Sequence, residues 1–300
     1  MKLRHHSVLL SGLAVLSIQA TWATNISGTI SSTLTITQNS QLTGDVTCTV
    51  TGNPCIQFGA SGIELQLNGH TMTGNGSRNI CTFSAGEDGI FTNGQNAVSI
   101  EGPGIVRRFR QRGIEVTGND SIVKHVTVLS SCLEGIVVAG HHNIIKDNSI
   151  ARASVGTNFD ASIWVQGTGS HVILHNEISA SGAFTGISGS APFPAGGGQG
   201  IFVGIGGGTP STNNIIQENN SSGIPGSGLF FTAGSTGNHV VRNQFLGNLI
   251  FDDIFDFFNA VGANDYDDNL CEVSRVGPSS INVCEIPNIS GHKNPDEEDN

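Results

Sequence analysis

Apolar and polar residues alternate with a period of two in short segments along most of the chain, and this pattern predicts β-strands rather than helices. Three central segments, residues 112–128, 134–150 and 161–178, repeat one phrase. In each, a short alternating strand, a Gly-containing turn, a second strand and a third short strand follow one another. A unit that recurs at intervals of roughly 20–50 residues predicts a solenoid, in which each coil packs on its neighbours.

The first strand of each repeat carries an apolar residue that we expect to point into the solenoid. Successive positions are separated by 22 to 38 residues, so the strands are constant and loops of different length lie between them. The expected inward positions are Ile90, Ile114, Ile136, Ile163, Ile201 and Leu229.

An Asn recurs between the second and third strands of the repeats. Asn tolerates the left-handed backbone of a tight corner and bonds to its own chain. Stacked coils would bring these side chains into a hydrogen-bonded ladder. We expect the ladder to begin at Asn148 and to continue through Asn176, Asn219 and Asn243.

These repeats resemble the right-handed parallel β-helix repeats of the pectin-lyase-like superfamily. Residues 65–74, Leu-Gln-Leu-Asn-Gly-His-Thr-Met-Thr-Gly, are similar to a phrase found early in its secreted members, and the resemblance covers roughly residues 55–250. It implies an all-β fold, a single-stranded right-handed parallel β-helix, with a long loop before each first strand and substrate over the first-strand sheet. Such folds host lyases, hydrolases, epimerases, adhesins and binding modules, so the resemblance does not specify an activity.

We expect the chain to contain five segments. Lys2 and Arg4 precede an apolar run, and cleavage after Ala23, with Ala20 as the alternative, would remove a secretory signal peptide. The run is shorter than the ~20 apolar residues that span a bilayer, so we expect no membrane span after cleavage and a secreted or periplasmic/extracellular location. The segments are a signal peptide (1–23), an N-terminal cap (24–54), the parallel β-helix (55–250), a C-terminal cap with a disulfide loop (251–290) and a disordered acidic tail (291–300).

The composition limits the kinds of binding partner and indicates the state of the cysteines. The chain carries a formal net charge of -11 and only 13 Lys plus Arg, which excludes nucleic acid as a partner because phosphate binding needs a basic surface. An even number of cysteines in an exported chain predicts disulfides. Sequence proximity favours Cys48–Cys55 and Cys271–Cys284, leaving Cys81 with Cys132, although other pairings stay open. Nothing in the sequence indicates the oligomeric state.

The residues that follow the inward positions are expected to point outward and to form one row across the sheet. Four of these six are aromatic in a chain with 6% aromatic residues. Flat aromatic rings stack on the apolar faces of sugars, so we predict a polysaccharide-binding face, although loops folding back over the row are the structural alternative. The expected substrate-binding residues are Phe91, Trp164, Phe202 and Phe230.

Candidate catalytic groups are carboxylates near this row, because acid–base work on polysaccharide needs a carboxylate pair or a base beside a neutralising charge. Glu115 lies in the row, Asp88 precedes Ile90, and Asp160 precedes Trp164. No two of them occupy a clearly facing position in the pattern. The hydrolase signatures of the superfamily are absent, and an arginine cluster at 107–112 has no evident acidic partner, so a lyase, an epimerase, a hydrolase and a non-enzymatic surface or binding scaffold all remain open.

Metal sites receive less support from the sequence. The resemblance extends to exported β-helix proteins associated with copper delivery, and histidines such as His141, His171 and His175 fall on predicted turns. These positions do not recur in one rung, which favours turn and surface roles. We expect no metal site and no cofactor, with calcium at the acidic run 265–269 as the open alternative.

Overall fold

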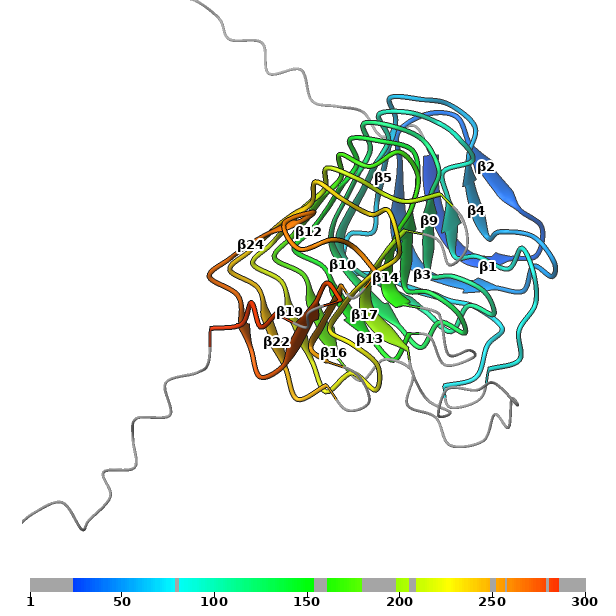
Figure 1. Ribbon diagram of the computed structural model, residues 1–300. Coiled ribbons are helices and arrows are strands. Elements are labelled where there is room, and N and C mark those ends of the chain that lie inside the picture. The colour runs from blue at the N-terminus through cyan, green and yellow to red at the C-terminus, as the bar shows by residue number, and fades with distance from the viewer. Residues whose placement is uncertain are drawn as a thin grey trace, which may run out of the picture.

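The computed structural model describes residues 24–78, 81–153, 161–179, 198–204, 209–248, 252–256, 258–278 and 281–285. All pairings between its named strands are parallel, which confirms the predicted right-handed parallel β-helix. No helix in these residues is long and apolar enough to cross a membrane. The strands form two sheets, and the colour order in Figure 1 runs along the stack of coils from one end to the other.

Sheet B contains the first strand of each coil, so it is the sheet for which a substrate face is expected. Its strands in spatial order are β2 (Leu34–Ile36), β4 (Ile56–Phe58), β7 (Ile90–Phe91), β9 (Ile114–Val116), β11 (Ile136–Val138), β14 (Ala161–Val165), β17 (Gln199–Val203), β20 (Leu229–Phe231), β23 (Ile254–Asp256) and β26 (Ser274–Val276).

Sheet A contains the second and third strands. Most of the early coils have one long strand that passes through the corner, whereas the coil at residues 64–73 and all coils from residue 144 onward have two short strands separated by the corner. Its strands are β1 (Thr24–Ile30), β3 (Ser40–Cys48), β5 (Glu64–Gln66), β6 (Thr71–Thr73), β8 (Ser99–Arg107), β10 (Ile122–Leu129), β12 (Ile144–Lys146), β13 (Ser149–Ala151), β15 (Val172–Leu174), β16 (Glu177–Ser179), β18 (Ile215–Gln217), β19 (Asn220–Ser222), β21 (His239–Val241), β22 (Gln244–Leu246), β24 (Asp265–Asp267) and β25 (Leu270–Cys271).

The core is a set of vertical apolar columns inside the coils. Ile136 pairs in register with Ile114 on one side and with Ile163 on the other, and all three side chains are fully buried. The predicted inward positions are thus confirmed. Parallel pairing starts in β1 and β2 and continues to β26. The boundaries between caps and coils remain predictions.

The Gly that precedes the inward Ile is explained by close approach of the next coil. A Cβ at Gly113 would lie 2.7 Å from the carbonyl oxygen of Gly135, and one at Gly135 would lie 2.7 Å from that of Ser162. Real Cβ atoms do not come this close to backbone, so the repeated Gly-Ile phrase reflects the coil spacing.

The corner between the second and third strands is built by the predicted Asn ladder. Asn176 Oδ1 accepts hydrogen bonds from the backbone N–H and the Nδ2 of Asn148, at 3.2 and 3.0 Å, and Asn219 receives the same two bonds from Asn176 at 2.9 Å each. The ladder begins at Asn148 as predicted and runs beyond Asn243 to Asn269. The residue before each corner position, which is Val126 in one coil and a ladder Asn in the others, has a φ between 50° and 58°, the left-handed conformation of a tight corner: His125, Asp147, His175, Glu218, Arg242 and Asp268.

A second ladder, which the sequence reading did not identify, occupies the turn before the second strands. Its buried members are Asn143, His171, Asn214, Asn238 and Asn264. Each Asn accepts from the backbone N–H of the previous coil, and His171 does so through Nδ1, 3.2 Å from the N of Asn143. One imidazole therefore replaces an amide in a row of amides.

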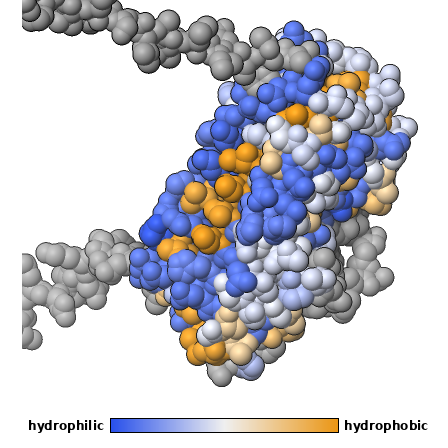
Figure 2. Space-filling view, turned by 90° about the horizontal axis from the view of Figure 1, so that it is seen from above, coloured by the Kyte–Doolittle hydropathy of each residue, from blue (hydrophilic) through white to orange (hydrophobic). Residues whose placement is uncertain are grey.

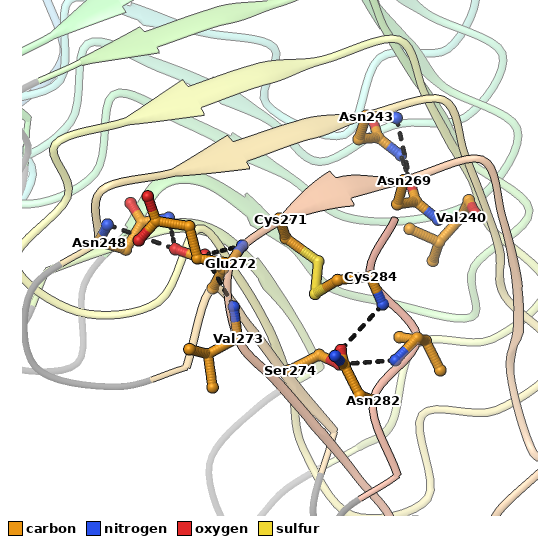
Figure 3. The surroundings of a disulfide bond; sticks show 12 residues. Val240, Asn243, Asn248, Asn269, Cys271, Glu272, Val273, Ser274, Asn282 and Cys284 are labelled. Carbon is orange, nitrogen blue, oxygen red and sulfur yellow. Dashed lines mark hydrogen bonds between the residues drawn. A yellow bond between two sulfur atoms is a disulfide. The ribbon is translucent and has the colours of Figure 1, made fainter. Parts of the chain in front are cut away.

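Three disulfides hold the coils and confirm the predicted pairing. Cys48–Cys55 and Cys81–Cys132 lie in the early coils, with Cα atoms 5.9 and 4.9 Å apart. Cys271–Cys284 fastens the segment after the last coil to β25, with Cα atoms 5.0 Å apart. Figure 3 shows this bond beside the end of the Asn ladder.

The outer surface of sheet A also carries apolar residues. Ile122, Ile144, Val172 and Ile215 form one outward column in register, and Ile215 is 40% exposed. Figure 2 shows an apolar band between hydrophilic margins on the side where Figure 1 labels β5, β12 and β24.

Candidate functional site

The outer face of sheet B carries a continuous row of four aromatic rings. β14, β17, β20 and β23 present Trp164, Phe202, Phe230 and Phe255 in one register. Neighbouring ring centroids are 5.6, 5.1 and 4.9 Å apart. These separations match the strand spacing of ~4.8 Å, so the parallel register itself brings the rings together. We call these four residues the aromatic row.

The aromatic row is half-buried. Phe202 in its middle is only 3% exposed, whereas Trp164, Phe230 and Phe255 are half-buried. The indole Nε1–H of Trp164 donates to the carbonyl oxygen of Gly204 at 2.6 Å. This bond fixes the indole, so Trp164 is a rigid platform beside the two stacked Phe pairs.

The C-terminal end of the row carries a cation and an exposed ring. Arg275 pairs in register with Phe255, and its guanidinium carbon lies 5.9 Å from the ring centroid. The same guanidinium bonds to Asp252 at 2.9 Å. Phe258, which is 56% exposed, contacts the rings of Phe230 and Phe255.

The structure brings together three of the four predicted substrate-binding residues and leaves Phe91 apart. Glu115 and Val137 stand between Phe91 and Trp164 in the register. The sequence reading missed Phe255, because the step from β20 to β23 was assigned to the C-terminal cap. The signal was present, since Phe255 follows the inward Ile254 as Phe230 follows Leu229.

Two predicted catalytic carboxylates, Asp88 and Glu115, meet beside β7 and β9. Arg112 lies between them: its backbone N–H donates to Asp88 at 3.0 Å and its guanidinium bonds to Glu115 at 3.0 Å. The guanidinium also bonds to buried Glu134 at 3.0 Å. The third candidate, Asp160, lies outside the described residues.

The protonation of this cluster follows from its burial. Burial first, and then the negative charge of Glu115, raise the pKa of Asp88 from 3.8 to about 7. Burial opposes the charge of Arg112, yet the attraction of Glu134, Glu115 and Asp88 raises the pKa of the guanidinium. At neutral pH the carboxyl of Asp88 therefore retains a proton for part of the time, beside the side chain of Glu115.

A narrow depression lies beside Asp88. It is too small to admit a water molecule, and its lining consists of Cys48, Val50, Asn53, Gly74, Asn75, Glu87, Asp88 and Phe109. Glu87 in this lining is held by two bonds from Arg110, at 2.7 and 2.6 Å.

Charged residues also follow the left-handed corner of sheet A. Asp147 lies between two imidazoles, 3.6 Å from His125 and 3.5 Å from His175, and His175 bonds in turn to Glu218. Arg242 completes the column through Glu218. Acidic side chains thus alternate with His or Arg side chains from coil to coil, an arrangement that ties the corners together at the surface.

The fold, the disulfides and the aromatic face together define a secreted or periplasmic right-handed parallel β-helix protein. The chain belongs to the family described as "Periplasmic copper-binding protein (NosD)", whose model matches residues 25–251. A comparison with curated proteins found no match.

Two solved structures share the fold at 14% sequence identity. The Dettilon tailspike protein matches with a TM-score of 0.51 over 85% of this chain and 56% of its own, so the chain spans little more than half of the tailspike. The A-module of a mannuronan C-5 epimerase from Azotobacter vinelandii matches with a TM-score of 0.50 over 84% of this chain and 77% of its own. At this identity the likeness shows the fold alone.

The family description raises the question whether this chain can hold copper, whose usual protein ligands are Cys, Met and His. All six cysteines are in disulfides, and Met72 is buried in the core. Both ring nitrogens of His171 are hydrogen-bonded. In the described ranges no three His, Cys, Asp or Glu side chains converge on a metal position. These residues do not fit a copper centre, and copper has no part in the function proposed below.

Proposed function

We propose that this exported β-helix binds an extended polysaccharide along the outer face of sheet B. The observation that supports this most is the aromatic row, in which β14, β17, β20 and β23 repeat one flat surface from coil to coil. A polymer of sugars is also a repeat along one axis, and its apolar C–H faces stack on rigid aromatic rings. In the alternative, a scaffold without carbohydrate binding, the row would serve only as a packing surface for loops that fold back over sheet B.

We further propose that Asp88 and Glu115 perform acid–base chemistry on the bound polymer. Val137 separates Trp164 from Glu115, so the carboxylate lies two coil spacings, roughly 10 Å, beyond the row. Glycoside cleavage uses one protonated carboxyl and one carboxylate. The raised pKa of Asp88 suits the first role, and Glu115, at the more exposed position, suits the second.

Binding is tested by calorimetric titration of the mature chain with a panel of oligosaccharides. Trp164→Ala and Phe230→Leu are the test variants, because the first deletes the indole and the second keeps apolar bulk without a flat face. Phe83→Ala is the matched control, since Phe83 is 55% exposed and outside the row. We expect about tenfold weaker binding in both test variants, equivalent to ~1.4 kcal/mol, with the control unchanged.

Turnover is tested on the same panel by measuring new reducing ends. Glu115→Gln keeps the shape of the side chain and should retain binding while abolishing turnover. Binding that is equal in Trp164→Ala, Phe230→Leu and the wild type, with all three folded, would refute the binding face. Binding without turnover in the wild type would leave a binding module and remove the acid–base pair.

A further inference from the structure

We infer that the polysaccharide on sheet B is a neutral glycan and not a polyuronate. This inference rests on the proposed function and specifies its substrate class. It follows from the positions of the Lys and Arg residues, which are scarce around the aromatic row and more frequent elsewhere in the chain.

No Lys or Arg occurs from Ala153 to Val241, a segment that contains Trp164, Phe202 and Phe230. The loops that precede β17 and β20 lie within this segment, and so does the loop that precedes β14 except for its first residue, Arg152, which directly follows β13. The histidines of the segment are on sheet A: His171 in the second ladder, His175 at the Asn corner and His239 in β21. The strands that carry Trp164, Phe202 and Phe230, and the loops before β17 and β20, therefore contain no Lys or Arg.

The arginines at the two ends of the face are already engaged by carboxylates. At one end Arg112 bonds to Glu115 and Glu134, and at the other Arg275 bonds to Asp252. A uronate would have to displace one of these partners. Moreover, Glu115 stands in the outward register itself, and the chain has a net charge of -11.

A polyuronate carries one carboxylate on every sugar. Laying such groups along half-buried rings without partners costs free energy, because a charge that leaves water needs a compensating ion pair or hydrogen bond. A neutral sugar has hydroxyls and apolar C–H faces and meets no such cost. Lyases and C-5 epimerases remove the proton beside a uronate carboxylate, a step that requires this group to be neutralised. A neutral substrate therefore leaves binding or hydrolysis as the activity.

The experiment compares neutral and uronate oligosaccharides of equal length by calorimetric titration of the mature chain. Mannan- and galactan-derived oligomers serve as neutral probes, and oligomannuronate and oligogalacturonate as acidic probes. Each titration is run at low and high salt, and with calcium or a chelator. We expect at least tenfold tighter binding of a neutral probe, about 1.4 kcal/mol, independent of salt and calcium.

A charge variant sharpens the comparison. Asp252→Asn should release Arg275 beside Phe255 and raise uronate affinity several-fold at low salt, with neutral binding unchanged. Tighter wild-type binding of a uronate, with or without calcium, would overturn the inference and leave the proposed binding face standing. No uronate gain in Asp252→Asn would equally contradict it. Binding of neither class would instead defeat the proposed function.

Discussion

His171 should make the stability of the β-helix sensitive to acid. Its side chain is fully buried in the second ladder, where Nδ1 accepts from the N–H of Asn143 at 3.2 Å and Nε2 lies 3.0 Å from the carbonyl oxygen of Gln166. A second proton on Nδ1 would remove the acceptor on which Asn143 depends. Burial accordingly lowers the pKa of His171 from 6.5 to about 4.

The sign and size of the effect follow from linkage. Between pH 6.5 and about 4 the unfolded chain binds a proton at this residue and the folded chain does not. The stability from the neutral imidazole is therefore complete above pH 6.5 and is lost as the pH falls through the folded pKa. At 1.36 kcal/mol per pKa unit, the loss amounts to about 3 kcal/mol.

His171→Asn tests this prediction, because Asn occupies the neighbouring positions of the ladder, as in Asn143 and Asn214. We expect the variant to lose about 1 kcal/mol at pH 7 through the smaller side chain and to lack the acid-dependent loss. Urea unfolding at a series of pH values measures both. In a chain that begins at Thr24, Trp22 is removed and Trp164 is the remaining tryptophan, so its fluorescence reports on the adjacent coil. His141→Asn, a half-exposed turn histidine, is the matched control.

The comparison must use the difference between variant and wild type, because Asp88 opposes His171 in the same pH range. The pKa of Asp88 is raised to about 7, so its contribution to stability is complete below 3.8 and is lost as the pH rises through 7. The slopes of the two groups partly cancel in the wild type. If His171→Asn and the wild type give parallel stability curves between pH 4 and 6.5, the reasoning is refuted.

Three further predictions concern stability and use the same urea assay. Asp88→Asn, which can keep the bonds to Arg112 and Glu115, should become increasingly more stable than the wild type from pH 4 to 7; an unchanged pH profile would contradict the raised pKa. Asn219→Ala leaves the buried N–H of Asn176 without an acceptor and should cost about 3 kcal/mol, whereas Asn53→Ala at the exposed surface should cost less than ~0.5 kcal/mol. Replacing both Cys271 and Cys284 by Ser opens a link between residues 13 apart and should cost about 3 kcal/mol, and an equally stable variant would show that the last coil holds without it.

The fold could be predicted from the sequence because each coil repeats the same local demands. Ile114, Ile136 and Ile163 form one buried column. The repeated sequence around them predicts both this buried position and the close-packed Gly that precedes Ile114 and Ile136. The Asn ladder at the corner could be predicted equally well, because a tight corner and a side chain that bonds along the stack both favour Asn. The second ladder was harder to predict, because one of its members is His171 and not Asn. Its Nδ1 accepts a backbone hydrogen bond in the way that the Asn Oδ1 atoms do.

The candidate site was only partly readable, because it depends on contacts between different positions of successive coils. Asp88 lies two residues before its inward Ile, whereas Glu115 lies one residue after the next one, so no single column of the alignment contains both. Arg112 joins them by bonding backward through its backbone and forward through its guanidinium. The repeat period predicts which residues of successive coils stack on one another. It does not predict which side chains from different positions of the repeat come into contact, because the turns between the two sheets determine those contacts.

A ladder of hydrogen bonds also needs a residue that accepts the last bond where the Asn repeat stops. Such a residue is not part of the repeat, so the repeat pattern does not predict it. In the second ladder Asn214 and Asn238 each donate through Nδ2 to the Asn of the next coil, whereas the last member, Asn264, has no further Asn to bond. Its Nδ2 donates at 2.9 Å to Asp256, a fully buried carboxyl that also accepts from Tyr266 at 2.7 Å. Burial raises the pKa of Asp256 while these donors oppose the rise. From the sequence, Asp256 was placed only in the C-terminal cap (251–290). Its place at the donor end of the amide row indicates instead a buried terminator, whose carboxyl satisfies the donors that the last coil would otherwise leave unpaired.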